Sequence, residues 1–379
     1  MKFLAEGDGH EFHVSRRRFM RATSSATAAG VLASIAGRAA GQSSGELRVL
    51  VGGGDWGKAN MEAYVKPFQA ETGIKVYPIT DEMDVAKLEL MVKTKSVTVD
   101  TWSIGQSTAF IAAEKGYLES IDYSIYQKGE LDAIVDFAKQ PFGVAALIYS
   151  TVMVYNTGKF PADKPRPTSW GEFWDVKEFP GVRALQSGTN GGGATGPWEE
   201  ALLADGVAPD ALYPIDIDRV FASLDKIKPH VRKWWGYGSE IQQMMRDKAA
   251  DVVSSFDGRA QYLIDEGAPL YINRKQAKLT WDYWVIAKGS PNARNAQRFV
   301  EFATRADRQA AFAQLIPYGP SNLKAYKLIP QKIAVKLASN PDYVASGIPV
   351  NGKWYTEVGS SGLTNSARLL ERWNEWILR

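Results

Sequence analysis

The sequence predicts an α/β protein of two lobes joined by a hinge, and three observations support this prediction. Helix and strand signals alternate along most of the chain, which is typical of a mostly parallel sheet covered by helices. The β-rich run 141–160 contains no turn and is too long for one ordinary strand, so we expect it to cross between lobes. A second run, 279–289, would carry the chain back, and a third crossing is expected near Tyr318. A ligand cleft would then lie between the lobes.

The N-terminal segment is expected to be an export signal. Residues 15–21 read SRRRFMR, and a weakly apolar stretch and small residues follow. The apolar part is too short and too rich in Ala and Ser to span a bilayer. The run resembles a twin-arginine signal, which implies a periplasmic protein whose signal peptide is residues 1–44. The mature chain is expected to start between Ala40 and Gly45.

The predicted first lobe, residues 45–148 and 286–318, begins with β-α-β-α order. Apolar residues between 61 and 68 recur at helical spacing until Gly73 ends the helix and a strand begins. Ligands of such sheets collect at the carboxyl ends of strands. The further elements expected are a helix at 84–93, a strand at 97–104 and a helix at 108–116.

The predicted second lobe, residues 149–285 and 319–379, continues this alternation. Ser169 and Glu172 have the spacing of a capping box, which indicates a helix start. The segment 250–267 predicts a strand, a turn and a helix. The other helices are expected at 198–206, 216–231 and 239–247, and in the C-terminal part up to residue 377.

Composition excludes several function classes. The presequence holds six Lys or Arg and three acidic residues, so the mature part has 39 of each and no net charge. This balance gives no support for a nucleic-acid partner. Without cysteine, and with His230 as the single histidine after residue 44, we expect no thiol chemistry, no His or Cys metal site and no cofactor.

The glycine loop VGGGDWGKAN, residues 51–60, matches two phosphate-binding patterns through Gly52, Gly54 and Gly57. A nucleotide site is nevertheless not expected. Ala59 lacks the hydroxyl that binds Mg²⁺, and Asp55 places a carboxylate where phosphate oxygens would lie. Export also removes the protein from the cytoplasmic nucleotide supply.

Several segments together resemble a known family. FQAETGIKV, EKGYLESIDYS, VYNTGKFP, TSWGEFWDVKEFPG, ALLADGVAPDALYPIDIDRVF and YGPSN occur in this order. They are similar to the extracytoplasmic solute-binding proteins of ABC importers, in the spermidine/putrescine-binding-like branch. The resemblance implies a periplasmic-binding-protein type II fold with two lobes and a hinge. It also implies a monomer that delivers an unchanged amine solute to a membrane permease.

The resemblance also implies which residues hold the solute. In this family stacked aromatic rings and carboxylates hold an amine, and a cation over an aromatic ring gains about 0.5 to 2 kcal/mol. Of Trp234 and Trp235, one is expected to line the cleft and the other to lie in the core, and we predict that Trp235 lines the cleft. The residues carried over by motif are Asp55, Trp56, Gln106, Ser107, Trp281, Asp282 and Tyr318.

One motif departs from the polyamine-binding pattern. Where relatives carry W-x-G-D, this chain has Phe256 and then Arg259 in place of the acid. An arginine would repel a diamine and pair with a carboxylate. This departure predicts a solute with an amine at one end and an acid at the other. An aromatic cleft with Asp282 also suits a polyamine or a choline-like cation, so these stay open beside a zwitterion of the amino-acid or aminobutyrate kind. Relatives usually contribute a further acid from the helix that corresponds to WEE, but Pro197 or Trp198 aligns near that position, so this acid has no clear counterpart here.

Structural explanations stay open for each candidate. Trp56 could be packing, Asp282 could belong to a structural ion pair, and Arg259 could be a helix-surface residue whose head reaches water. The prediction is a binding protein and not an enzyme. The alternative is a secreted carboxylate-dependent hydrolase, because scattered acids permit a two-carboxylate mechanism.

Overall fold

The computed structural model describes residues 45–81, 83–189 and 195–379, with the backbone only for Asp55. The predicted signal peptide, residues 1–44, lies outside the described residues. In the described part, no helix has both the length and the apolar character that a membrane span needs.

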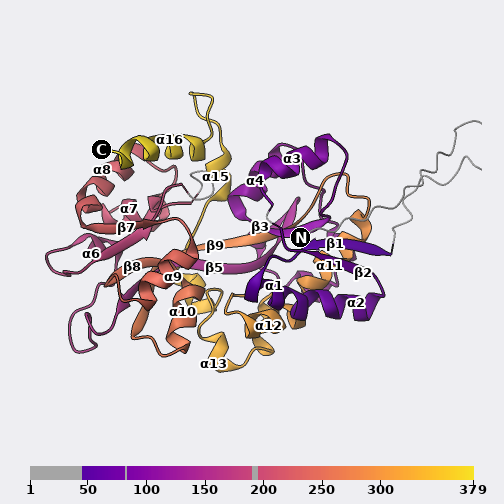
Figure 1. The fold of residues 1–379 in the computed structure, drawn as a ribbon, viewed down its shortest axis with the longest axis horizontal. Coiled ribbons are helices and arrows are strands. Elements are labelled where there is room, and N and C mark those ends of the chain that lie inside the picture. Colours follow the sequence, from indigo (N-terminus) through magenta and orange to yellow (C-terminus); the bar gives the residue numbers. More distant parts are fainter. Residues whose placement is uncertain (1–44, 82, 190–194) are drawn as a thin grey trace, which may run out of the picture. The chain divides into compact units, whose positions relative to one another are not determined.

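A mixed sheet of ten strands forms the frame of the described residues (Figure 1). Its main path is β2-β1-β3-β9-β5-β8-β6-β7, while β10 pairs with β9 and β4 with β5. The outer pairs are parallel, but β9 runs antiparallel to β3 and β5, and β5 runs antiparallel to β8. The expectation of a mostly parallel sheet therefore holds at both ends and fails in the middle. The strands are Glu46–Leu50 (β1), Lys75–Ile79 (β2), Thr101–Gly105 (β3), Lys139–Gln140 (β4), Gly143–Asn156 (β5), Arg183–Gln186 (β6), Val231–Trp235 (β7), Val252–Phe256 (β8), Leu270–Ile286 (β9) and Ile348–Pro349 (β10).

The two long strands lie where the sequence predicted crossing strands. β5 has 14 residues and β9 has 17, and they pair with each other through the middle of the sheet (Figure 1). β9 begins at Leu270, nine residues before the predicted run. The pairing shifts register twice, at Ala145/Leu147 and at Thr151/Met153. The third crossing pairs Ile148 with Gly319, whose N–H and C=O groups exchange hydrogen bonds of 2.8 and 2.9 Å.

Local signals place the helices as expected in several cases. Asp84 caps its helix by accepting a hydrogen bond from Lys87 N at 2.7 Å. Gly73 ends the first long helical segment with a φ of 70°. The helices are Gly54–Asn60 (α1), Lys66–Thr72 (α2), Val85–Lys93 (α3), Gln106–Glu114 (α4), Lys128–Leu131 (α5), Trp170–Trp174 (α6), Trp198–Ala204 (α7), Ile217–Ile227 (α8), Gly238–Arg246 (α9), Asp257–Asp265 (α10), Ala293–Ala303 (α11), Ala306–Leu315 (α12), Gln331–Ala334 (α13), Pro341–Ser346 (α14), Gly352–Thr356 (α15) and Asn365–Ile377 (α16).

The buried apolar residues divide along the crossing strands. β5 contributes residues up to Ile148 to one large cluster, together with β1, β3 and the end of β9. From Val152 onward it contributes to two other clusters, which contain α7, α8, α16 and the inner face of α10. A fourth cluster joins residues from Ala306 to Leu337, on both sides of the predicted boundary at residue 318. The exact lobe boundaries therefore stay predictions.

Candidate functional site

A small cavity lies where the crossing strands meet the helices on either side. Its volume is about 190 Å³, below the usual range of drug-sized sites, which favours a small solute. It joins residues from α1, β5, α9, β8, α10 and β9 and from the loop after α12. The lining residues are Trp56, Leu147, Tyr149, Gly238, Phe256, Arg259, Asp282 and Tyr318.

The glycine loop serves to place Trp56. Gly52 has a φ of 73°, and a Cβ there would lie 2.9 Å from Trp56 Cδ1. A Cβ on Gly57 would lie 2.3 Å from Gly52 O. The tight turn therefore needs glycine so that the α1 backbone can fold back and bring the indole ring to the cavity. This accounts for the G-x-G-x-x-G pattern without a phosphate.

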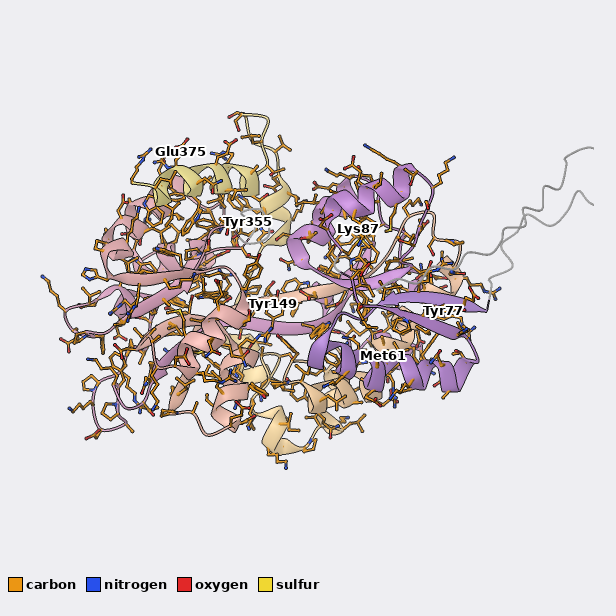
Figure 2. The ribbon with its side chains drawn as sticks, viewed as in Figure 1. Met61, Tyr77, Lys87, Tyr149, Tyr355 and Glu375 are labelled. Atoms are coloured by element: carbon orange, nitrogen blue, oxygen red, sulfur yellow. The ribbon has the colours of Figure 1, made fainter. Side chains whose placement is uncertain are left out.

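Aromatic rings form most of the cavity wall. Trp56 meets Tyr318 edge to face at 5.7 Å, and Tyr318 meets Tyr149 at 6.1 Å. Tyr149 lies near the middle of β5 (Figure 2). Its ring also meets that of Phe256, with the ring centres 5.7 Å apart. Burial raises the pKa of Tyr318 to about 12, and the nearby Arg259 charge opposes that rise. These phenol groups stay neutral at ordinary pH and offer ring surfaces and hydroxyls.

Asp282 supplies the negative charge of the cavity. It lies on β9 opposite Leu147 and Gly105, next to the register shift in β5. Burial raises the pKa of this carboxyl to about 6, and a hydrogen bond with Tyr149 opposes the rise. Among the described residues, Asp282 has no ion-pair partner, so a cation in the cavity would meet an uncompensated carboxylate.

Arg259 supplies the positive charge. It lies in the first turn of α10, and its Nη1 donates to Gln242 Oε1 at 3.0 Å. The side chain is exposed and lines the cavity, and it pairs with no acid among the described residues. A Cβ on Gly238 would lie 3.2 Å from Arg259 Nε, so the missing side chain leaves room for the guanidinium.

A larger hollow of about 430 Å³ adjoins the cavity. The two share Trp56, Arg259 and Tyr318. Arg246 and Gln242 add polar groups to it, and no acidic side chain that the structure describes lines it. A carboxylate that approaches through this hollow meets positive charge, which would favour anionic groups at this end.

The other predicted site residues lie elsewhere. Trp235 is buried behind Phe256, with the rings 5.2 Å apart, and donates to Ser254 O at 3.0 Å. Trp281 packs on Phe137, on the side of the sheet opposite to Asp282, because successive residues of a strand face opposite sides. At the start of α4, Gln106 and Ser107 are both buried; a Cβ on Gly352 would lie 2.3 Å from Gln106 Oε1. The Asp55 side chain lies outside the described residues.

Three lining residues escaped the sequence analysis. Leu147 pairs with Asp282 across two strands that are far apart in the sequence, and this pairing leaves no local signal. Gly238 looked like an ordinary turn glycine. Tyr149 could have been suspected, since it places a hydroxyl within an apolar strand that was expected to cross at the cleft.

Comparisons with known proteins agree with this architecture. Residues 63–343 match the family described as bacterial extracellular solute-binding protein. The gamma-aminobutyric acid-binding protein of Pseudomonas aeruginosa is 31% identical over 348 residues, which cover 90% of this chain and 93% of that protein. The spermidine/putrescine-binding periplasmic protein of Escherichia coli is 25% identical over 317 residues, which cover 80% of this chain and 86% of that protein. The solved structure of the Atu4243-GABA receptor has a TM-score of 0.77 at 31% identity and covers 87% of this chain and 97% of its own.

The fold is that of the periplasmic-binding-protein type II class. The chain belongs to the bacterial extracellular solute-binding protein family, whose members serve ABC importers. This confirms the predicted fold and function class. Proteins of this family are described as binding solutes.

Proposed function

We propose that this protein is a periplasmic receptor for a small zwitterion with one amine and one carboxylate, of the γ-aminobutyrate kind. The observation that carries the proposal is that Asp282 and Arg259, each without an ionic partner among the described residues, line one small aromatic cavity. The solute would be passed unchanged to the membrane permease of an ABC importer.

The amine end would be held at Asp282. Its ammonium group gains a counter-ion and the ring faces of Trp56, Tyr149 and Tyr318, each worth about 0.5 to 2 kcal/mol once water is excluded. A bound cation also favours the ionised form of a carboxyl whose pKa is raised to about 6.

The carboxylate end would pair with Arg259. A guanidinium binds a carboxylate through two parallel hydrogen bonds, whereas it repels a second ammonium. This favours a zwitterion over the polyamines bound by the Escherichia coli relative, and it agrees with the γ-aminobutyrate named for the Pseudomonas relative. The arginine is therefore the residue that separates the two solute classes.

Calorimetry of wild type and Arg259→Asp against γ-aminobutyrate and putrescine tests the proposal. The variant should bind γ-aminobutyrate at least tenfold more weakly and gain affinity for putrescine. Arg232→Asp, an exposed arginine on β7 outside the cavity, is the charge-matched control and should change neither affinity. Tight putrescine binding by the wild type, with no binding of γ-aminobutyrate, would reject the zwitterion.

Export by the twin-arginine route is a separate part of the proposal, supported by SRRRFM. Arg16→Lys together with Arg17→Lys should leave the precursor in the cytoplasm. Unchanged periplasmic accumulation would reject that route. We also propose that the receptor acts as a monomer, without a nucleic-acid partner or a metal.

A further inference from the structure

A second set of charges lies fully inside the protein, on β9 and α7. Lys278 Nζ donates to Glu200 Oε2 at 2.9 Å, to Glu199 Oε2 at 3.2 Å and to Gly196 O at 2.6 Å. The three charged side chains are 7% exposed or less. An ammonium has three N–H donors, and this site offers one acceptor for each.

The two carboxylates are held differently. Glu199 Oε1 accepts hydrogen bonds of 2.5 Å from the hydroxyls of Tyr213 and Tyr355, the latter on α15 (Figure 2). Burial raises the pKa of Glu199, but the Lys278 charge and these hydroxyls outweigh it and leave the pKa lowered. Glu200 Oε1 is buried without a hydrogen-bond partner among the described residues. Burial and the Glu199 charge raise the pKa of Glu200.

This arrangement is costly as a mere support for the fold. Removing three charges from water often costs more than their attraction returns, and well-packed apolar residues would serve as well. Burial alone would lower the pKa of Lys278, but the two carboxylates outweigh it and raise the pKa, so the ammonium stays charged. The site is therefore built for a cation rather than for packing.

The cluster also shares a face of the sheet with Asp282. Thr151 pairs with Lys278, Tyr149 with Thr280, and Leu147 with Asp282, without a register shift between them. Because alternate residues of a strand face the same side, Lys278 and Asp282 project from one face, roughly 13 Å apart at about 3.3 Å per residue.

We infer that Glu199, Glu200 and Gly196 O form an alkylammonium-binding site and that Lys278 of the same chain occupies it. Both carboxylates are therefore not free to bind a solute. The inference rests on the proposed function in one respect: it limits the receptor to solutes with a single amine. A longer polyamine that reached along β9 would meet the Lys278 charge instead of free carboxylates.

The first test asks whether the site binds a free amine once the lysine is shortened. Lys278→Ala removes three carbons and the ammonium, so n-propylammonium matches the space. The variant is made in an Asp282→Asn background, which removes the amine counter-ion of the main cavity. Saturating n-propylammonium should raise its melting temperature by about 2 °C or more, and 1-propanol should not. Lys278→Met, whose side chain fills the space, should not respond.

Absence of this rescue in a folded variant, or equal rescue by 1-propanol, would overturn the inference. If Lys278→Ala does not fold unaided, the same comparison is made on its refolded yield. These measurements need no γ-aminobutyrate, so they remain decisive even if the proposed solute is wrong.

The second test concerns selection. In the Asp282 wild-type background, Lys278→Ala should lower the ratio of the spermidine Kd to the γ-aminobutyrate Kd by tenfold or more. Lys226→Ala, an exposed lysine paired with Asp205, should leave the ratio unchanged. An unchanged ratio in Lys278→Ala would reject the selective role even where rescue succeeds. Failure of the wild type to bind γ-aminobutyrate would instead reject the proposed function.

Discussion

Two acidic sites, one at Lys278 and one at Asp282 of β9, differ in what neutralises them. Glu199 and Glu200 surround a lysine of the same chain, and almost every donor and acceptor there is paired. Asp282 has only a tyrosine hydroxyl, lies beside a cavity, and pairs with no cation among the described residues. The comparison teaches that a buried acid already paired within the chain is closed to a solute, whereas one left unpaired beside a cavity can bind a cation from outside.

The same contrast between an unpaired and a paired charge holds for two arginines, Arg259 at the cavity and Arg274 on β9. Within the described part of the chain, Arg259 has only Gln242 as a hydrogen-bond partner, while Arg274 pairs with Asp257 at 3.1 Å and donates to Lys336 O. Arg274 and Asp257 together fix the start of α10, because Asp257 also accepts from Ser150 N on β5. A paired arginine therefore positions the helix from which the unpaired arginine projects.

The largest expected effect is on stability, at the paired site. Lys278→Met leaves two carboxylates buried without their cation, so the free energy of unfolding should fall by about 3 to 5 kcal/mol. Urea unfolding measures this loss. Lys226→Met breaks an exposed pair with Asp205 and should cost no more than about 1 kcal/mol. Similar small losses in both variants would contradict the contrast between the two sites.

At the unpaired site the expected effect is on binding. Asp282→Asn removes the counter-ion of the solute amine and should weaken binding by about 2 to 5 kcal/mol, measured by calorimetry. Its stability should not fall, since a raised pKa shows that the folded protein disfavours this charge. A loss of affinity below about tenfold, with an intact circular dichroism spectrum, would make Asp282 structural.

A pH titration sharpens the same contrast. The pKa of Asp282 is raised to about 6, so at pH 5 about a tenth of the empty receptor carries the carboxylate that binds an amine. Affinity should be steady above pH 7 and fall about tenfold between pH 7 and pH 5.

The stability trend has the opposite sign. A carboxyl whose pKa is higher in the folded than in the unfolded state stabilises the protein when protonated. Relative to Asp282→Asn, the empty wild type should therefore gain stability as pH falls from about 6 toward about 4. A wild type and variant with parallel profiles of affinity and stability would contradict the assigned pKa.

Sequence reasoning reached the fold class and five residues of the cavity, and the limits are physical. Trp56, Phe256, Arg259, Asp282 and Tyr318 each follow a motif at a strand end or crossing, where local pattern is informative. Strand direction is not encoded in local periodicity, so the antiparallel middle of the sheet was missed.

Long-range pairings were equally hidden. Glu199 and Lys278 are 79 residues apart, and nothing in WEEALLADG or in KLTWDYWVIAKG indicates that they meet. The same holds for Gln106, whose position at a strand end predicted a ligand contact but whose side chain is buried against Gly352. Tertiary contact decides both cases.

The smallest expected effect concerns the aromatic wall, where the contrast is between a ring that meets the solute and rings that only pack. Trp56→Leu keeps an apolar group against Phe312 but removes the ring face offered to an ammonium, so affinity should fall about 2- to 30-fold. Trp234→Leu is the matched control, because this half-buried tryptophan packs on Trp373 and Trp376 away from the cavity and should cost stability without changing affinity. Calorimetry with γ-aminobutyrate separates the two. If Trp56→Leu binds as tightly as the wild type while Asp282→Asn does not, the indole ring only completes the packing around Phe312, and the rings of Tyr149 and Tyr318 must supply the cation contact.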